Sequence, residues 1–171
     1  MLDPMTSENA KFLADFLLGQ LRYESGITRK VLAAVPADTS SYKPSEKCMS
    51  GIQLAAHLAT AEAFFLMGVL KGEFAPGQPP ELKTPAEVVA WYDANIPALY
   101  DQVAAMSGEK LATPVNFMNF MNEPAVIYLA MSLKHGIHHR GQLSSYLRPM
   151  GTKVPGIYGP SGDEPVVAAG A

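Results

Sequence analysis

The sequence is poor in the residues that build several common classes of site. Its 171 residues include one cysteine, Cys48, which excludes an intrachain disulfide and a cysteine-rich zinc site. Charged residues make up 17% and the formal net charge is -3, so we expect no surface that binds nucleic acid or an anionic membrane. The N-terminal residues contain no basic segment followed by an apolar run. We therefore expect no secretory signal and a cytoplasmic protein.

Long hydrophobic runs are also scarce, and residues 51–70 form the only run of about bilayer-spanning length. This run contains Gln53, His57 and Glu62. A charge in the centre of a membrane costs roughly 2.5 to 3.5 kcal/mol. The run therefore predicts a helix buried in a protein core, without membrane association.

Apolar residues recur at helical spacing in four segments, at about residues 6–35, 50–70, 84–107 and 122–148. Phe12 and Phe16 lie beside the apolar stripe of the first segment. No stretch alternates long enough to predict a regular strand, although the apolar connector at 111–121 has room for a short one. The chain is predicted to be one domain over residues 1–171. Its fold class is all-α, a four-helix bundle with an irregular Pro/Gly-rich tail at 149–171.

Local signals mark the ends of several predicted helices. Ser50 with Gln53, and Thr84 with Glu87, can each form a capping box. Asn122 is expected to cap the fourth helix. The first and third connections are short enough for the helices that they join to pack as antiparallel neighbours.

Histidines are the most informative residues for chemistry. His135 and His139 are four residues apart on a predicted helix and therefore share a face, the spacing with which helices hold a metal ion between two imidazoles. His57 lies among small apolar residues near the middle of the second helix and is expected to point inward. Three imidazoles on one divalent ion would leave positions open for water or substrate. From spacing alone the question stays open, because such a pair also occurs where each histidine caps or stacks.

Four segments carry a resemblance to a known family: HGIHHRGQLSSYLRPMG at 135–151, YKP at 42–44, MSGIQLAAHLATAE at 49–62 and KVPGIYGPSGDE at 153–164. In sequence and order they resemble the DinB/YfiT-like superfamily of metalloproteins. The resemblance implies a four-helix bundle of that type with an unusual connection order. It also implies one divalent transition metal per chain with the ligands His57, His135 and His139, and a homodimer.

The same resemblance implies a function. Relatives with a known activity are thiol-dependent transferases and a mycothiol-dependent isomerase, so we expect a metal-dependent enzyme that transfers a low-molecular-weight thiol to a small-molecule substrate, or a hydrolase. The metal would lower the pKa of a bound thiol or water. Imidazole suits Zn, Ni, Cu and Fe alike, so the metal is not identified. Two alternatives are a non-catalytic stress-response protein that binds a metal or small ligand, and a metal-free dimerisation module.

Three residues are candidates for a supporting role, and no catalytic residue is assigned. Gln142 shares the face of the histidine pair and could orient a ligand histidine or a metal-bound water, or pack against the first helix. His138 is expected beside the ligands or at the surface. Glu24, on the first helix, is a candidate base near the metal. Arg140 is expected on a solvated face, with a position toward the tail or a dimer partner as the alternative. Glu62 is expected to be a surface group or a pairing group.

The tail contains an apolar cluster, with Val154, Ile157 and Tyr158 among prolines and glycines. A disordered tail would seldom carry such a cluster. We expect residues up to about Pro160 to pack back on the bundle, near the mouth of the metal pocket or across a dimer interface.

Overall fold

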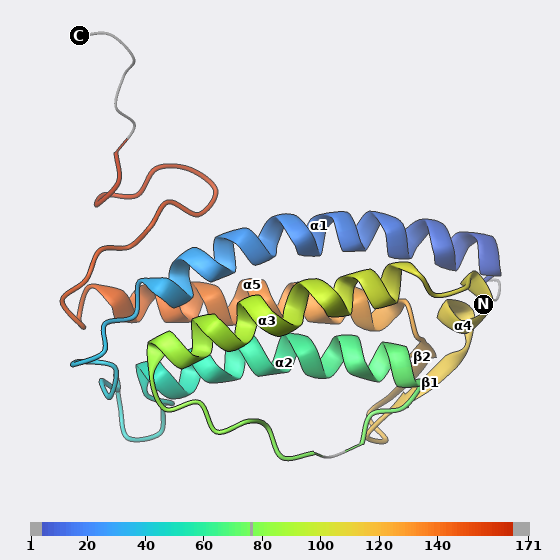
Figure 1. The fold of residues 1–171 in the computed structure, drawn as a ribbon, viewed down its shortest axis with the longest axis horizontal. Coiled ribbons are helices and arrows are strands. Elements are labelled where there is room, and N and C mark those ends of the chain that lie inside the picture. Colours follow the sequence, from blue (N-terminus) through green and yellow to red (C-terminus); the bar gives the residue numbers. More distant parts are fainter. Residues whose placement is uncertain (1–4, 76, 166–171) are drawn as a thin grey trace, which may run out of the picture.

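Four long helices account for most of the chain (Figure 1), in a computed structural model that describes residues 5–75 and 77–165. The elements in chain order are α1 (Ser7–Ala33), α2 (Gly51–Lys71), α3 (Pro85–Ala104), α4 (Gly108–Ala112), β1 (Pro114–Phe117), β2 (Met121–Pro124) and α5 (Ile127–Leu147). The predicted bundle of four main helices is confirmed, with a small hairpin added. Residues 166–171 of the predicted tail lie outside the described residues.

The order of the helices around the bundle differs from the expectation. α1 and α2 each pack against both α3 and α5, so α1 and α2 lie diagonally opposite each other, as do α3 and α5. The expectation that the first and third connections join antiparallel neighbours is therefore wrong. The connection at 34–50 is long enough to cross the end of the bundle, and α4 and the hairpin occupy the chain between α3 and α5.

α2 and α3 run in the same direction (Figure 1), so the connection at 72–84 has to return along the length of α2. Helix α2 has 21 residues and is about 31 Å long. The connecting residues span at most about 45 Å even when fully extended. Pro79 and Pro80 favour an extended backbone here. The described parts of the connection therefore lie along α2 as an extended segment.

The predicted capping boxes are both present. Ser50 Oγ accepts a hydrogen bond from the backbone N–H of Gln53 at 3.3 Å, and Gln53 Oε1 accepts one from that of Ser50 at 2.9 Å. Thr84 and Glu87 form the same reciprocal pair at the start of α3. α3 ends earlier than predicted, because Ser107 starts the short helix α4 as its N-cap.

The predicted start of the last long helix is wrong. Residues 121–124 form β2, which pairs antiparallel with β1, so Asn122 is a strand residue and not an N-cap. The side chain of Asn116 accepts a hydrogen bond from the backbone of Asn119 at 2.8 Å, and Met118 and Asn119 have φ values of 50° and 63°. This left-handed turn reverses the chain. The short strand expected in the connector is confirmed, and α5 begins only at Ile127.

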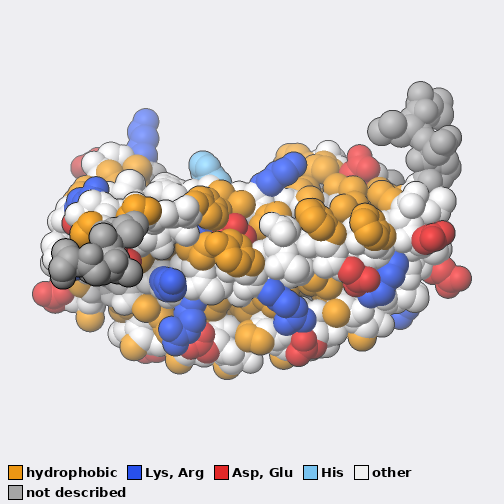
Figure 2. All heavy atoms as spheres, turned by 90° about the horizontal axis from the view of Figure 1, so that it is seen from above, with side chains coloured by type: hydrophobic (Ala, Val, Ile, Leu, Met, Phe, Trp, Pro, Cys, Tyr) orange, Lys and Arg blue, Asp and Glu red, His pale blue; other side chains and the backbone are white. Residues whose placement is uncertain are grey.

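The core fills the space between the inward faces of the four long helices. Its largest fully buried apolar side chains include Leu32, Leu54, Leu58, Leu66, Ile96, Leu129 and Leu143. Within the described ranges, α2 alone is long and apolar enough to cross a membrane, and half of its most apolar window is buried in the bundle, as for a core helix. Phe12 and Phe16 point away from this core. Figure 2, which looks down on α1, shows apolar side chains at that surface.

The tail after α5 packs back on the bundle, which confirms that part of the prediction. Val154 and Ile157 lie against the core, and the hydroxyl of Tyr158 donates to the carboxylate of Glu24 on α1 at 2.9 Å. No described tail residue lines the two cavities that border His57. The tail therefore stabilises the α1–α5 side of the bundle.

Candidate metal centre

Three histidines from two packed helices converge at one point. His57 on α2 and the pair His135 and His139 on α5 have ligand nitrogens that all lie within 4.8 Å of one another. Their ring centroids are 5.0, 4.7 and 4.3 Å apart. The i, i+4 spacing places the pair on one face of α5, and the packing of α2 against α5 brings His57 to that face.

The surroundings of the cluster favour neutral imidazoles. Burial, reinforced by His139 and the other histidines, lowers the pKa of His135 to about 4. Burial also lowers the pKa of His57, and the charge of His139 adds to the effect. Phe65 packs edge-on against the ring of His135 with centroids 5.6 Å apart. Since a neutral imidazole is the form that binds a metal ion, this environment prepares the three side chains as ligands.

Gln142 supports the cluster directly. Its Oε1 lies 3.0 Å from Nδ1 of His139, and its Nε2 lies 3.4 Å from the hydroxyl of Tyr146. A hydrogen bond from Nδ1–H to this amide oxygen favours the tautomer of His139 whose Nε2 is free to bind a metal ion. The structure thus places Gln142 against a histidine of the cluster, the first of the two arrangements considered from the sequence.

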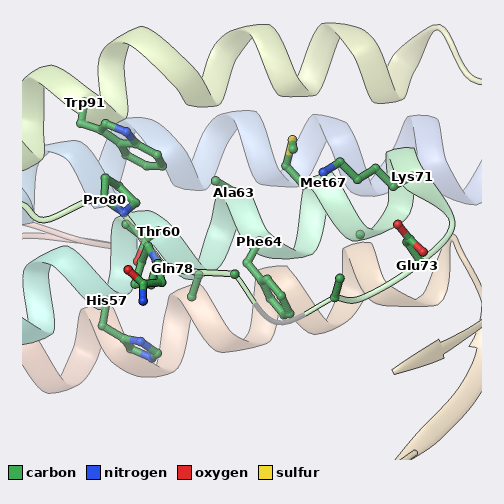
Figure 3. Close-up of a pocket in the computed structure, with 15 residues that line it drawn as sticks. His57, Thr60, Ala63, Phe64, Met67, Lys71, Glu73, Gln78, Pro80 and Trp91 are labelled. Carbon is green, nitrogen blue, oxygen red and sulfur yellow. The ribbon is translucent and has the colours of Figure 1, made fainter. Parts of the chain in front are cut away.

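Two cavities border the cluster and meet at His57. The larger, about 470 Å³, lies between α2, α3 and the extended connection. Figure 3 shows His57 at one end, Lys71 and Glu73 at the other, and Phe64, Met67 and Trp91 among the lining side chains. A second cavity of about 420 Å³ continues past His57 along the start of α2. Both volumes are in the range of small-molecule sites.

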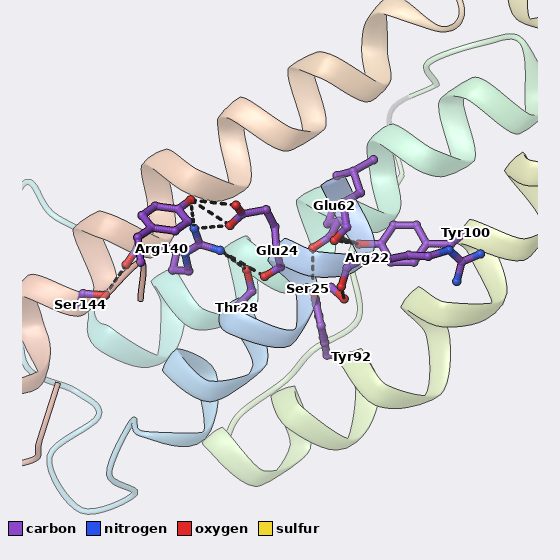
Figure 4. Close-up of polar contacts among 11 residues, drawn as sticks. Arg22, Glu24, Ser25, Thr28, Glu62, Tyr92, Tyr100, Arg140 and Ser144 are labelled. Carbon is purple, nitrogen blue, oxygen red and sulfur yellow. Dashed lines mark hydrogen bonds and ion pairs between the residues drawn. The ribbon is translucent and has the colours of Figure 1, made fainter. Parts of the chain in front are cut away.

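His138 and Glu24 lie apart from the three ligand atoms. His138 is exposed, with its ring stacked edge-on beside that of His139. The carboxylate of Glu24 forms an ion pair with Arg140 at 2.5 Å (Figure 4). Arg140 is only 1% exposed and also donates to Thr28 Oγ1 at 3.3 Å, so the expectation that it faces solvent is wrong. Glu24 and Thr28 are more than 100 residues away from Arg140 in the chain, and local spacing therefore gives no signal of them.

Glu62 is not at the surface, the first of the two positions expected for it, but is paired inside the bundle. Glu62 is buried between helices, and the hydroxyls of Tyr92 and Tyr100 on α3 donate to its carboxylate (Figure 4). Burial raises the pKa of Glu62, against the opposing effect of these hydrogen bonds and of Arg140. Its neighbours in the sequence are largely apolar, which is the one signal that could have placed it inside.

The three histidines fit a divalent ion. A tetrahedral ion with bonds of about 2.0–2.1 Å to imidazole needs nitrogens about 3.4 Å apart, within reach of rotamer adjustment from the present separations. Three protein ligands leave a coordination position for a small molecule, and His57 borders the cavities where that molecule would lie. Gln142 supplies the hydrogen bond that metal-bound histidines generally make.

The fold and the site define a class of protein: a bundle of four main helices in which three histidines converge on a candidate metal site. Comparison with known families identifies this class. The DinB family model matches residues 5–166, so the chain belongs to the DinB family.

The chain is similar to two uncharacterized proteins of Bacillus subtilis. YjoA is 28% identical over 135 residues, which cover 75% of this chain and 86% of YjoA. YrdA is 24% identical over 152 residues, which cover 88% of this chain and 90% of YrdA.

Solved structures show the same fold. The crystal structure of YjoA, a DinB-like protein, superposes with a TM-score of 0.69 at 22% identity and covers 82% of this chain and 96% of YjoA. The crystal structure of a DinB-like protein from Bacillus cereus ATCC 10987 superposes with a TM-score of 0.70 at 25% identity. The match covers 83% of this chain and 95% of that chain. The predicted membership of the family and the predicted fold are confirmed.

Proposed function

We propose that this protein is a metal-dependent transferase that joins a low-molecular-weight thiol to a small electrophilic substrate. His57, His135 and His139 would hold one divalent ion. The observation that carries the proposal is the position of His57, which belongs to the three-histidine cluster and lines both neighbouring cavities. A metal ion at this point would be able to bind a molecule that lies in either cavity. The activities implied by the family resemblance support the same reaction class.

The site supports thiol transfer over hydrolysis. A divalent ion held by the three histidines would lower the pKa of a thiol bound to it and so supply a nucleophile at neutral pH. Hydrolysis would be assisted by a carboxylate beside the ion that acts as a general base. Among the described residues, however, the clustered ligand atoms come from histidines alone. Glu24 and Glu62 are engaged by Arg140 and by tyrosines. In the transfer, sulfur bonds to the electrophilic carbon, the leaving group departs with its electron pair, and the thiol proton passes to solvent.

The larger cavity favours an apolar substrate body. Phe64, Met67 and Trp91 form much of its wall, and Lys71 and Glu73 at its far end carry opposite charges. A neutral aliphatic or aromatic electrophile would fit such a lining, with its reactive carbon towards His57. The second cavity, with Gln53, Glu81 and Lys83, has a larger share of polar side chains in its lining and would take the thiol.

A turnover assay tests the proposal. Protein freed of metal by a chelator and reloaded with Zn²⁺, Ni²⁺ or Fe²⁺ would be assayed with cysteine, glutathione, coenzyme A and mycothiol against 1-chloro-2,4-dinitrobenzene. We expect thiol-dependent product with one of these combinations, lost on chelation and in His57→Ala, and retained in His138→Ala. If the protein binds metal stoichiometrically but no combination gives turnover, the result would contradict the proposed transferase activity. It would favour the alternative of a non-catalytic binding protein.

Binding to the larger cavity has its own readout. Trp91 is the only tryptophan of the chain, and it lines this cavity. We expect 1-chloro-2,4-dinitrobenzene to quench its fluorescence saturably, and Met67→Glu to weaken that effect. Quenching that is linear in concentration in both proteins would refute the assignment of this cavity to the electrophile.

A further inference from the structure

A series of polar contacts leads from the histidine cluster to the loop that precedes α2. Oε1 of Gln142 lies 3.0 Å from Nδ1 of His139, and Nε2 of Gln142 lies 3.4 Å from the hydroxyl of Tyr146. This hydroxyl in turn forms a hydrogen bond with the thiol of Cys48. Oγ of Ser45 lies 3.2 Å from the same sulfur. The series thus connects a candidate metal ligand with side chains that the proposed reaction does not use.

The orientation of the Gln142 amide decides which nitrogen of His139 is free. When Oε1 faces the ring, it accepts a hydrogen bond from Nδ1–H, and Nε2 of the neutral ring carries no proton. When the NH₂ group faces the ring, it donates to Nδ1, and the proton of the neutral ring lies on Nε2. A metal ion binds only an unprotonated nitrogen. A half-turn of this amide therefore converts His139 from a form that can bind a metal ion through Nε2 to a form that cannot.

The ring of Tyr146 is fixed by its surroundings. The residue is 3% exposed, and its ring packs edge-on against that of Tyr42, with centroids 5.8 Å apart and an angle of 84° between the planes. Buried hydroxyl groups are hydrogen-bonded in the large majority of cases. Among the described residues, the Tyr146 hydroxyl is the one acceptor that Nε2 of Gln142 reaches. Tyr146 therefore holds the NH₂ end of the amide away from His139.

Cys48 determines the direction of the hydrogen bonds that Tyr146 makes. The pKa of Cys48 is lowered first by the hydrogen bond with Ser45 and, against the effect of burial, also by that with Tyr146. A hydrogen bond lowers the pKa of a thiol when the sulfur accepts it, because it stabilises the charged form. A tyrosine hydroxyl has a single proton to donate. Because Tyr146 donates this proton to sulfur, its oxygen accepts from Gln142 and favours the amide orientation that leaves Nε2 of His139 free.

We propose that Tyr146, directed by Cys48, is a positioning residue that selects the metal-binding tautomer of His139 through the amide of Gln142. Tyr146 lines neither of the two cavities at His57, so it acts on the site only through this contact. The inference deepens the metal site of the proposed function and rests on it, but it requires nothing of the thiol or of the electrophile.

Nitrogen NMR of the metal-free protein tests the tautomer directly. The ¹⁵N shifts of a neutral imidazole distinguish its protonated nitrogen from the other, and His139→Asn identifies the signals of His139. At about pH 8, above the usual pKa of an imidazole, we expect mainly the Nδ1–H form in the wild type. Tyr146→Phe removes the acceptor of the Gln142 amide and should give a mixture in which Nε2–H is populated. Tyr42→Phe is the matched control, because it removes the hydroxyl of the other ring in the same pair, and it should match the wild type.

Replacements of Cys48 test the direction of the contacts. Cys48→Ala removes the sulfur that accepts the Tyr146 proton. The hydroxyl is then free to donate to Oε1 of Gln142, and His139 should again become a mixture of tautomers. Cys48→Ser keeps an acceptor at this position and should match the wild type. Since Cys48 is half-buried and lies outside the core, these variants decide the question even if Tyr146→Phe fails to fold.

Binding of Zn²⁺ alone provides a second readout. In competition with a fluorescent chelator, Tyr146→Phe should bind Zn²⁺ about tenfold more weakly than the wild type, the lower end of the effect of losing a hydrogen bond that orients a ligand histidine. Tyr42→Phe should keep the wild-type affinity.

The outcomes separate this inference from the proposed function. An Nε2–H tautomer in the wild type would overturn the inference, as would a wild-type tautomer in Tyr146→Phe or Cys48→Ala. An equal change in Tyr42→Phe, or an unchanged Zn²⁺ affinity in Tyr146→Phe, would overturn it as well. A wild-type protein that binds no Zn²⁺, Ni²⁺ or Fe²⁺ would instead refute the metal site of the proposed function, while the NMR spectra would still decide whether Tyr146 sets the tautomer of His139.

Discussion

We expect Arg140→Met to destabilise the protein more than the replacement of any other charged side chain on α5. Arg140 is 1% exposed, and its guanidinium bridges α1 and the tail. It contacts the carboxylate of Glu24 at 2.5 Å, the hydroxyl of Tyr158 at 2.5 Å and Oγ1 of Thr28 at 3.3 Å. Methionine preserves much of the apolar stem but removes the charge and all of these donors.

The magnitude follows from what is left behind. Removing one partner of a buried ion pair costs about 3–5 kcal/mol, because the other charge stays desolvated. Tyr158 still donates to Glu24 in the variant, which places the expected loss at the lower end, about 3 kcal/mol. For a domain of this length that corresponds to a fall in Tm of roughly 6–12 °C.

Arg148→Met is the matched control for this comparison. Arg148 lies on the same stretch of chain, but its side chain is 59% exposed and pairs with Asp163 at 3.0 Å. Exposed pairs contribute about 0–1 kcal/mol. Urea and thermal unfolding, followed by circular dichroism on chelator-treated protein, would measure both variants free of metal effects. A loss below about 1 kcal/mol in Arg140→Met, or an equal loss in both variants, would refute the reasoning.

Three further changes have definite expected results. Burial raises the pKa of Glu62 above its usual 4.5, so its contribution to stability is full below that pH and falls as the pH rises above it. Glu62→Gln should therefore gain stability relative to wild type as the pH is raised from about 4.5 in urea titrations, and a pH-independent difference would contradict this. Truncation after Met150 removes Tyr158 and should lower the Tm while metal binding is retained; an unchanged Tm would show that the tail is dispensable. Gln142→Leu should weaken metal affinity about 10–100-fold by calorimetry through loss of its contact to His139, and an unchanged affinity would remove its supporting role.

Features fixed by residues a few positions apart were predictable from the sequence. The capping boxes at Ser50 and Thr84 depend on a partner three residues away, and both are present. The shared face of His135 and His139 follows from one helical turn. The sequence offers His57 as a third member, but its assignment to this pair depends on the family resemblance, since spacing cannot show which helices are neighbours.

Features that depend on distant partners were not predictable in this way. Arg140 is buried because Glu24 and Thr28 lie beside it in the fold, and Glu62 because Tyr92 and Tyr100 do. The sequence pattern predicts helix from residue 122, inside the hairpin at 114–124, because the turn of this hairpin has left-handed backbone at residues other than glycine, which the pattern does not signal. The helix order likewise follows from global packing, which no single segment encodes.

The metal content of untagged protein tests the central claim most directly. Purified wild-type protein, loaded with excess Zn²⁺ and dialysed, would be analysed by mass spectrometry of the ion alongside His57→Ala and His138→Ala. We expect about one ion per chain in the wild type and in His138→Ala, and a marked loss in His57→Ala. Equal loss in both variants, or a full complement of metal in His57→Ala, would contradict a site built from His57, His135 and His139.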